Sequence, residues 1–287
     1  MCVATDLHGH TYYSDGTESP ESFVTTRLGA GVRVVAVSDH DLLAAVAPAA
    51  AAAAAHGAIL IPALEATAFV GLGTQAAEQF HVLGYYPPRR LVDGSLERSF
   101  FYQRGLKVQA TWRDFVLEWL AGLQPADRQA LDPGDELARL PAAEFPALQR
   151  VLTRIVTRLD AQRPQVFRHF IRSHVRFWTG NPELFGWSPE ELIDALRSDG
   201  AIDIVAHPAR YRDKERLARV LLGASGVEVY TSRHRPDWAL RFRKFAEQHG
   251  KLWTASTDDH GKAAYAPPPC GTPRWVVERL LDAPLPQ

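Results

Sequence analysis

Two histidines and a carboxylate near the start of the chain have the types and spacing of metal ligands. His8 and His10 are two residues apart, and Asp15 follows within a Ser-Asp-Gly-Thr segment. Side chains alternate along a strand, so a strand over residues 2–6 would project both imidazoles the same way. A turn would then bring Asp15 back toward them. Neutral imidazoles and carboxylates bind divalent ions, and this stretch therefore predicts half of a metal site.

Further candidate ligands follow later apolar stretches, where strands are expected to end. They are Asp39, His40, Glu65, His81, His207, Asp258 and His260. Nine of the candidates in both sets, all except Asp39, are the strongest in the chain. Nine ligands are too many for one ion, so we expect two or three divalent ions that share Glu65. Because none of them is a cysteine, the set favours Mn, Zn or Fe with open coordination positions over structural zinc. Clustered divalent ions bind phosphoryl oxygens and activate water, which is the chemistry of phosphate-ester hydrolysis.

Short apolar stretches and helix signals predict the elements that position these residues. Ser19-Pro20 supplies an N-cap and a first-turn proline for a helix that ends at Gly29 or Gly31. Ser188-Pro-Glu-Glu191 is a capping box. Further helices are expected over residues 43–56 and 237–249, and helical periodicity without a strand over 96–178. The expected strands cover residues 2–6, 32–37, 58–62, 80–84, 202–206, 226–230 and 252–256.

The alternation of strands and helices predicts an α/β fold with parallel strands. In a closed barrel of parallel strands, the carboxyl ends lie on one face, where barrel enzymes build their sites. The candidate ligands stand just after these strands or close to them, with Glu65 just past the strand over 58–62 and His81 near the start of the next. This convergence favours a barrel over an open doubly wound sheet.

Composition limits the class of protein. The chain has 287 residues, 46% hydrophobic and 23% charged, which is typical of a globular protein. Cys2 and Cys270 cannot form a disulfide framework, and the sequence has neither a membrane-length apolar run nor a secretory signal. We therefore expect a cytoplasmic protein without membrane contacts. Residues 1–88 are acidic, which suits divalent ions, and residues 89–187 are basic, which suits an anionic substrate.

Several motifs resemble the polymerase-and-histidinol-phosphatase (PHP) family of phosphoesterases, in order and in spacing. They span roughly residues 1–86 and 200–262: Asp6-Leu-His-Gly-His-Thr11, Ser14-Asp-Gly16, Ser38-Asp-His-Asp41, Glu65, His81-Val-Leu-Gly-Tyr85, Ala206-His-Pro208 and Asp258-Asp-His260. The resemblance implies a distorted (β/α)7 barrel with a helical insertion and a trinuclear metal centre. It also implies hydrolysis by a metal-bridging hydroxide.

The resemblance assigns the ligands to three ions. His8, His10, Glu65 and Asp258 would hold the first, Glu65, His81 and His207 the second, and Asp15, His40 and His260 the third. Asp39 would orient a ligand imidazole from outside the metal shell. On this basis, residues 1–87 and 188–287 form the metallohydrolase barrel, and residues 88–187 form a helical lid over or beside the active site.

Within the family, the chain is most similar to the branch of nucleotide and oligonucleotide phosphoesterases. It shares Ala206-His-Pro-Ala-Arg-Tyr211, Glu228-Val-Tyr230 and His234-Arg-Pro236 with that branch. The insertion of that branch carries Arg-Pro-His, whereas this chain has Arg163-Pro-Gln165. The resemblance implies a nucleotide phosphatase, for example for 3′,5′-bisphosphonucleotides.

Two further side chains are candidates for catalysis. Arg210 follows the His207 loop, where a guanidinium could clamp a phosphoryl group or form a surface ion pair. His234 could be a general acid or a loop histidine. Arginines repeat every four residues in two stretches and could guide a nucleic-acid backbone or form solvated helix faces: Arg150, Arg154, Arg158, Arg168, Arg172 and Arg176.

Three alternatives to the nucleotide phosphatase remain open. The first is a 5′-3′ exonuclease on short single-stranded oligonucleotides, which the arginines would favour. The second is a phosphatase for another phosphorylated small molecule, similar to histidinol phosphatase. The third, which the complete ligand set disfavours, is a non-enzymatic module that binds nucleic acid. The sequence makes no prediction of the oligomeric state.

Overall fold

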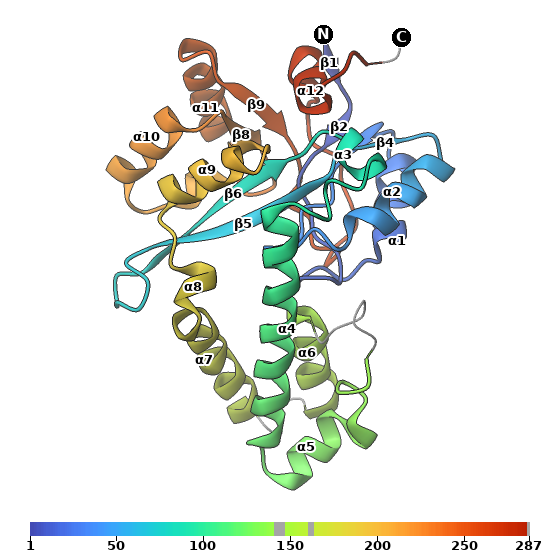
Figure 1. Ribbon diagram of the computed structural model, residues 1–287, viewed down its shortest axis with the longest axis vertical. Coiled ribbons are helices and arrows are strands. Elements are labelled where there is room, and N and C mark those ends of the chain that lie inside the picture. Colours follow the sequence, from blue (N-terminus) through green and yellow to red (C-terminus); the bar gives the residue numbers. More distant parts are fainter. Residues whose placement is uncertain (141–146, 160–163, 286–287) are drawn as a thin grey trace.

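The strands of the protein form three separate sheets in the computed structural model, which describes residues 1–140, 147–159 and 164–285 (Figure 1). In the smallest sheet, β1 (Cys2–Val3) pairs with β10 (Thr272–Pro273). In the second, β2 (Thr5–Asp6), β3 (Val34–Val35) and β4 (Ile59–Leu60) run parallel. The third holds five strands in chain order: β5 (Ala63–Val70), β6 (Glu78–Tyr85), β7 (Ile202–Val205), β8 (Gly226–Tyr230) and β9 (Leu252–Ala255).

The third sheet is mixed, which corrects the expectation of parallel strands throughout. β6 is antiparallel to both β5 and β7, whereas β7, β8 and β9 are parallel. Residues 71–77 join β5 directly to β6 without a crossover helix, and a short connection of this kind permits only antiparallel pairing. The strand expected over 58–62 stops at Leu60, and the chain continues as β5. Glu65 therefore lies inside a strand, not beyond its end.

Six helices pack around these sheets, and their predicted start signals are present. The side chain of Ser19 caps α1, and Ser188 and Glu191 form the expected capping box at α9. α2 begins at Val46, not at residue 43, so Pro48 lies in its first turn, where the missing N–H breaks no helical hydrogen bond. The six are α1 (Pro20–Gly29), α2 (Val46–Ala55), α9 (Pro189–Ser198), α10 (Lys214–Gly223), α11 (Pro236–Gln248) and α12 (Arg274–Leu281).

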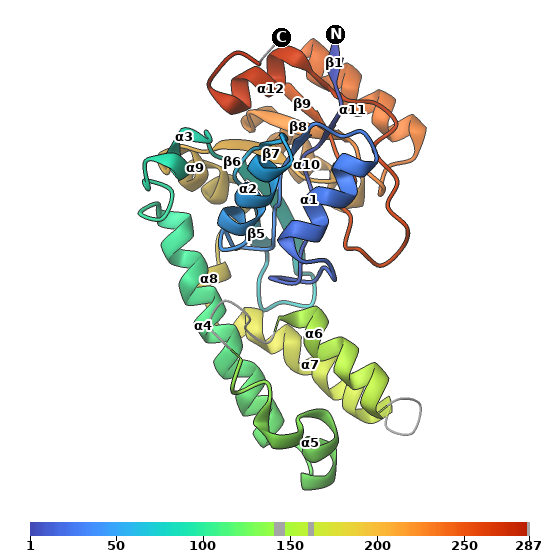
Figure 2. The same cartoon turned by 90° about the vertical axis from the view of Figure 1, so that its right-hand side faces the viewer.

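The described part of residues 88–187 is helical and contains no strand, as the sequence predicted. Its longer helices extend away from the sheets (Figures 1 and 2). Aromatic side chains of α4 and α7 pack on one another. These helices are α3 (Arg89–Val92), α4 (Phe100–Ala121), α5 (Pro125–Leu131), α6 (Leu148–Arg154), α7 (Pro164–Gly180) and α8 (Pro182–Phe185), with a 3₁₀ turn over Pro133–Asp135 and a π-helical turn over Ile155–Leu159.

The predicted (β/α)7 barrel is not formed as one closed sheet by the strands of the described residues. The fold is mixed α/β, with its strands divided among the three sheets. Two isolated parallel bridges connect the residues that follow β2 and β3 with the five-stranded sheet and its continuation: Gly9 pairs with Asp259, and His40 pairs with Glu65. Among the described helices, none has the length and apolar character that a membrane crossing requires.

Candidate metal centre

All nine predicted metal ligands lie together at one end of the two larger sheets. They come from the residues after β2, β3, β7 and β9, from the loop before α1, and from within β5 and β6: His8, His10, Asp15, His40, Glu65, His81, His207, Asp258 and His260. Two of them, His207 and Asp258, have positive φ angles of 30° and 53°. Left-handed backbone at non-glycine residues is strained and is concentrated at functional sites.

The carboxylate of Glu65 stands at the centre of the cluster. Its Oε1 lies 2.9 Å from Nδ1 of His81 and 2.9 Å from Nε2 of His207. Its Oε2 is surrounded by three more imidazoles: Nε2 of His8 and of His10, both at 3.3 Å, and Nδ1 of His40 at 3.0 Å. Glu65 is fully buried. One carboxylate thus contacts five histidines, which suits a ligand that bridges ions.

Two further carboxylates complete the cluster on either side of Glu65. Asp258 Oδ1 is 3.3 Å from Nε2 of His10 and 3.6 Å from Nε2 of His8. Asp15 lies 3.2 Å from Nε2 of His260 and 3.7 Å from Nε2 of His40. The predicted first and third ligand sets are therefore each brought together.

The electrostatics of the cluster couple its acids to its imidazoles. Burial raises the pKa of Glu65, but the charges of His81, His8 and His40 hold it well below its usual range. Burial lowers the pKa of His10, but contacts with the Asp258 and Glu65 carboxylates raise it to about 10. Divalent ions bind carboxylates and neutral imidazoles, so they would replace the protons that otherwise balance these acids.

Buried atoms without hydrogen bonds test whether this cluster fits metal ions. Six such atoms belong to the predicted ligands: His8 Nε2, His10 Nε2, Asp15 Oδ1, His40 Nδ1, Glu65 Oε2 and His81 Nε2. Buried polar atoms are normally satisfied, and a metal ion satisfies such lone pairs. Ligand atoms within 4.8 Å of one another form three groups: His10, Asp15, His40 and His260; His8, His10 and Glu65; His40, Glu65 and His81. The donor set fits divalent metal ions.

Glu228 orients two of these ligands, a role that the sequence analysis did not assign. Its buried carboxylate lies 3.0 Å from Nδ1 of His8 and accepts hydrogen bonds from the backbone N–H of His207 at 2.7 Å and from Ser256. A carboxylate at Nδ1 turns the lone pair of His8 Nε2 toward Glu65 and Asp258. The available signal was an acid in the middle of the apolar strand Gly-Val-Glu-Val-Tyr.

Asp39 supports the loop that carries His10. Its carboxylate accepts hydrogen bonds from the backbone and hydroxyl of Thr11 and from the hydroxyl of Ser14, the last at 2.5 Å. Ser14 Oγ in turn lies 3.5 Å from Nδ1 of His10. Asp39 therefore contacts the ligand imidazole through Ser14 and lies outside the cluster.

A cavity of about 640 Å³ opens onto the cluster, and two arginines line it. Arg210, which the sequence analysis selected together with His234 as a candidate for catalysis, is exposed and lines this cavity. Arg233, which the sequence analysis did not select, donates from Nε to Asp258 Oδ2 at 2.5 Å. His234 does not line this cavity. Its Nδ1 lies 2.8 Å from the carbonyl of Val229 and its Nε2 accepts from the N–H of Ala209, so it has the contacts of a loop histidine.

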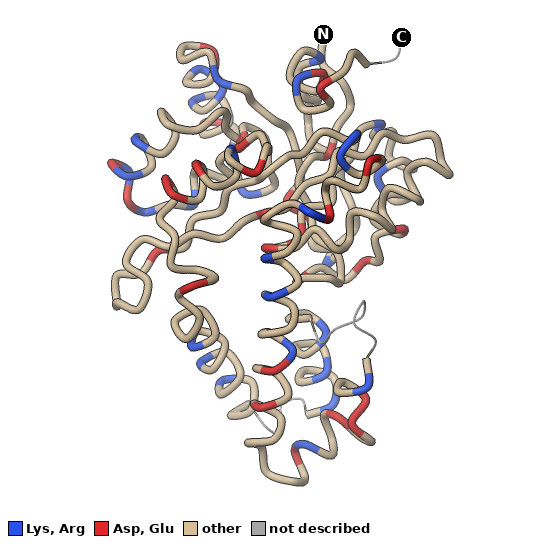
Figure 3. Tube along the Cα trace, in the orientation of Figure 1, with Lys and Arg blue, Asp and Glu red and all other residues tan. Residues whose placement is uncertain are grey.

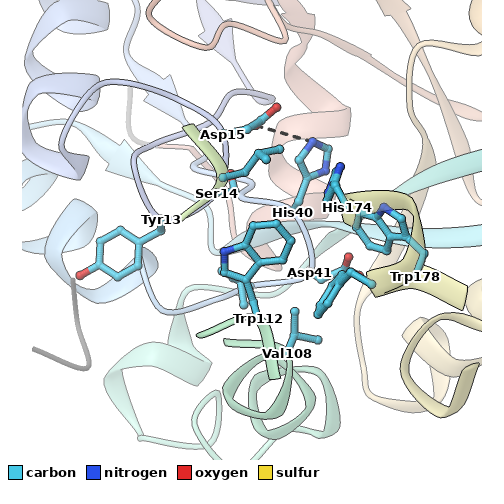
Figure 4. Close-up of a pocket in the computed structure, with 12 residues that line it drawn as sticks. Tyr13, Ser14, Asp15, His40, Asp41, Val108, Trp112, His174 and Trp178 are labelled. Atoms are coloured by element: carbon cyan, nitrogen blue, oxygen red, sulfur yellow. Dashed lines mark ion pairs between the residues drawn. The ribbon is translucent and has the colours of Figure 1, made fainter. Parts of the chain in front are cut away.

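The helical segment contributes His174 and Trp178 of α7 to the wall of the same cavity. Burial lowers the pKa of His174 to about 4, with Asp15 and His40 as its charged neighbours. Figure 4 shows this imidazole beside His40, with Trp178 next to it. Of the Arg163-Pro-Gln165 segment, Arg163 lies outside the described residues. The family resemblance predicted a histidine at this segment, where the chain has Gln165. His174, nine positions later, was not among the candidates.

The arginines that repeat every four residues differ between the two stretches of the chain. Arg154 and Arg158 bond to Leu131 and Glu136 within the helical segment, and Arg154 also pairs with Asp132. On α7 the other three arginines are exposed and form a basic face that Figure 3 shows in blue: Arg168, Arg172 and Arg176.

Relatives of known activity match the chain along most of its length, although no family model matches it. A 3′,5′-nucleoside bisphosphate phosphatase of Chromobacterium violaceum is 25% identical over 273 residues, covering 89% of this chain and 86% of that protein. The 5′-3′ exoribonuclease Rnm of Escherichia coli is 25% identical over 281 residues, covering 90% and 85%. The predicted resemblance to the PHP phosphoesterases is confirmed.

Solved structures share the fold of this chain. A Bifidobacterium adolescentis protein described as a metal-dependent phosphoesterase has a TM-score of 0.66 at 20% identity, covering 99% of this chain and 97% of the other. An amidohydrolase of Chromobacterium violaceum with bound sulfate has a TM-score of 0.64 at 20% identity, with coverage of 98% and 96%. Both cover the helical segment as well as the sheets, so the whole chain has the mixed α/β fold of these neighbours.

Proposed function

We propose that this protein hydrolyses phosphate monoesters of nucleotides, with 3′,5′-bisphosphonucleotides as the first candidate substrates. The chain is an enzyme, a metal-dependent hydrolase of phosphoric esters. The observation that carries the proposal is the buried Glu65 carboxylate with five imidazoles around it, open to a cavity that two arginines line. The relative named for 3′,5′-nucleoside bisphosphates supports the choice of substrate.

The same residues would hold two or three divalent ions, of Mn, Zn or Fe. We assign His8, His10, Glu65 and Asp258 to one ion, Glu65, His81 and His207 to a second, and Asp15, His40 and His260 to a third. When bound, such ions lower the pKa of a coordinated water and offset the charge on a phosphoryl group. Burial lowers the pKa of His81 to about 4 in this structure, which keeps that imidazole in its neutral, ligating form.

The arginines at the cavity would bind and orient the phosphoryl group. Arg210 is free of acidic partners among the described residues and can form paired hydrogen bonds to two phosphoryl oxygens. Arg233 already pairs with Asp258, so it would contribute charge at the mouth of the cavity while it holds that ligand. We assign no proton transfer to His234, since both of its ring nitrogens contact main-chain groups.

We further propose that the two larger sheets make a distorted seven-membered ring, the barrel that the family resemblance implies. The two bridges would join β2 to β9 and β3 to β5. Side chains in and just after the strands of both sheets pack in one interior cluster with two side chains of α12: Leu7, Ile61, Leu83 and Ile204 with Val276 and Leu280. In this division, residues 1–87 and 188–287 form the barrel, and residues 88–187 form the lid.

A 5′-3′ exonuclease is the second candidate, and the exposed arginines of α7 favour it. A basic helix face near the cavity would attract the backbone of a short single strand. The relative named as an exoribonuclease also supports this alternative. A phosphatase for another small molecule is the third candidate, and it needs no basic face.

Release of inorganic phosphate and of mononucleotides distinguishes these candidates. We expect Mn-loaded enzyme to release phosphate from 3′,5′-bisphosphoadenosine at a higher kcat/KM than from an aryl phosphate. Substituting Arg168, Arg172 and Arg176 by Ser should leave this rate unchanged. Faster release of mononucleotides from a 5′-phosphorylated oligonucleotide, sensitive to that triple substitution, would replace the phosphatase by the exonuclease.

A further inference from the structure

We propose that an aromatic cavity between the barrel loops and the helical segment binds the nucleobase of the substrate. The proposal rests on the nucleotide phosphatase function. The cavity encloses about 480 Å³ of space between protein atoms, part of it open to solvent. Figure 4 shows the residues that line this cavity. Its apolar wall consists of Tyr13, Leu42, Val108, Trp112, Phe177 and Trp178.

This cavity adjoins the one that opens onto the cluster of predicted metal ligands. Five residues line both of them: Asp15, His40, Leu148, His174 and Trp178. Two of the five are predicted metal ligands. A phosphoryl group held at the cluster would therefore leave the rest of its molecule at the entrance of the aromatic cavity.

Aromatic rings give the cavity the flat apolar surfaces that a base can stack on. Trp112 of α4 meets Phe177 edge to face, with ring centres 4.9 Å apart, and Trp178 packs in the same way on Phe185 at 4.6 Å. These contacts hold both indoles in place before a ligand arrives, so little side-chain entropy would be lost on binding. Stacking on aromatic rings is available to every nucleobase.

His174 supplies a polar group at the boundary between the two cavities. Its ring stands edge to face with Trp112 at 5.3 Å and with Trp178 at 5.4 Å. No hydrogen bond to its nitrogens is formed within the described ranges 1–140, 147–159 and 164–285. A neutral imidazole offers one donor and one acceptor, which match the polar edge of a base or a ribose hydroxyl.

The test compares two tryptophans of α4 that are equally buried. Trp112 and Trp119 are each 6% exposed, but Trp119 does not line the aromatic cavity. The readout is the ratio of kcat/KM for 3′,5′-bisphosphoadenosine to that for a base-free pentose 3,5-bisphosphate. For Trp112→Leu, we expect this ratio to fall roughly 5- to 100-fold, the loss of one stacked base. For Trp119→Leu, we expect the ratio of the wild type.

An unchanged ratio in Trp112→Leu, with both substrates hydrolysed by the wild type, would overturn the base cavity and leave the phosphatase function standing. If the wild type hydrolyses neither substrate, the phosphatase function fails. Binding of adenosine 5′-monophosphate to the chelated protein then tests whether the aromatic cavity binds a nucleobase. Weaker binding by Trp112→Leu than by Trp119→Leu supports it, and equal binding overturns it. Should Trp112→Leu not fold, Val108→Phe fills the same cavity, and the same outcomes apply.

Discussion

Metal binding by single residues of the cluster depends on how each predicted ligand is oriented. Each imidazole has two nitrogens, and only a fixed tautomer presents a lone pair to an ion. Glu228 lies at Nδ1 of His8, and Ser14 with Asp39 lies at Nδ1 of His10, so Nε2 of both rings points into the cluster. The first residues of the chain thus depend on an acid more than two hundred positions away.

Replacement of that acid tests the orientation directly. Glu228→Gln keeps the shape of the side chain but removes its charge, so we expect metal affinity to fall by about 10- to 100-fold. Equilibrium titration of the chelated protein with Mn measures the affinity. Glu247→Gln, an exposed substitution on α11, is the matched control. An affinity equal to that of the control would contradict the role of Glu228.

The buried imidazole of His174 predicts a pH dependence of stability. Burial lowers the pKa of His174 to about 4 from its usual 6.5, so between these two values the unfolded chain binds a proton that the folded chain does not. Stability therefore rises with pH through this window and is complete above it. We expect the free energy of unfolding of His174→Phe, without metal, to vary less between pH 4 and 6.5 than that of the wild type.

Denaturant unfolding at several pH values measures this slope. The exposed His56 provides the control, since His56→Phe changes a histidine outside the site. Equal slopes in the wild type and His174→Phe would contradict the prediction.

At the scale of elements, a buried ion pair connects the helical segment to the loop after β3. Arg104 of α4 donates from Nη1 to Asp41 at 2.9 Å and also bonds to the carbonyl of Leu184. Asp41 follows the ligand His40, and its carboxylate accepts from the N–H of Thr67 in β5. The helices that form the aromatic cavity are thereby connected to the loop that carries a metal ligand.

Removal of this arginine would leave the carboxylate of Asp41 buried and unpaired. We expect Arg104→Met to lower the free energy of unfolding by about 3–5 kcal/mol, measured by denaturant titration. Lys107→Met, an exposed substitution on the same helix, should have little effect. Adding Asp41→Asn to Arg104→Met should restore part of the loss, since the two side chains interact directly. Additive losses in the double variant would contradict the coupling.

At the scale of the whole molecule, the sequence predicted the gathering of the candidate ligands better than it predicted the sheets. These residues come together because most of them follow strands or stand within them, even though some strands are only two residues long. The antiparallel β5–β6 pair was missed because parallel strands were expected throughout, whereas residues 71–77 join these two strands without a helix. The position of Glu65 inside β5 was missed for the same reason. The aromatic cavity could not be predicted, since α4 and α7 meet only through tertiary packing of rings that are distant in sequence.

The central claim is that the Glu65 cluster makes this protein a metal-dependent phosphoesterase. Phosphate release from 3′,5′-bisphosphoadenosine, measured after chelation and again after Mn is added, tests it most directly. We predict no release by the chelated wild type, recovery with Mn, and a rate about 100-fold or more lower in Glu65→Gln, with Glu247→Gln unaffected. Equal rates with and without metal, or in Glu65→Gln and the wild type, would contradict the account.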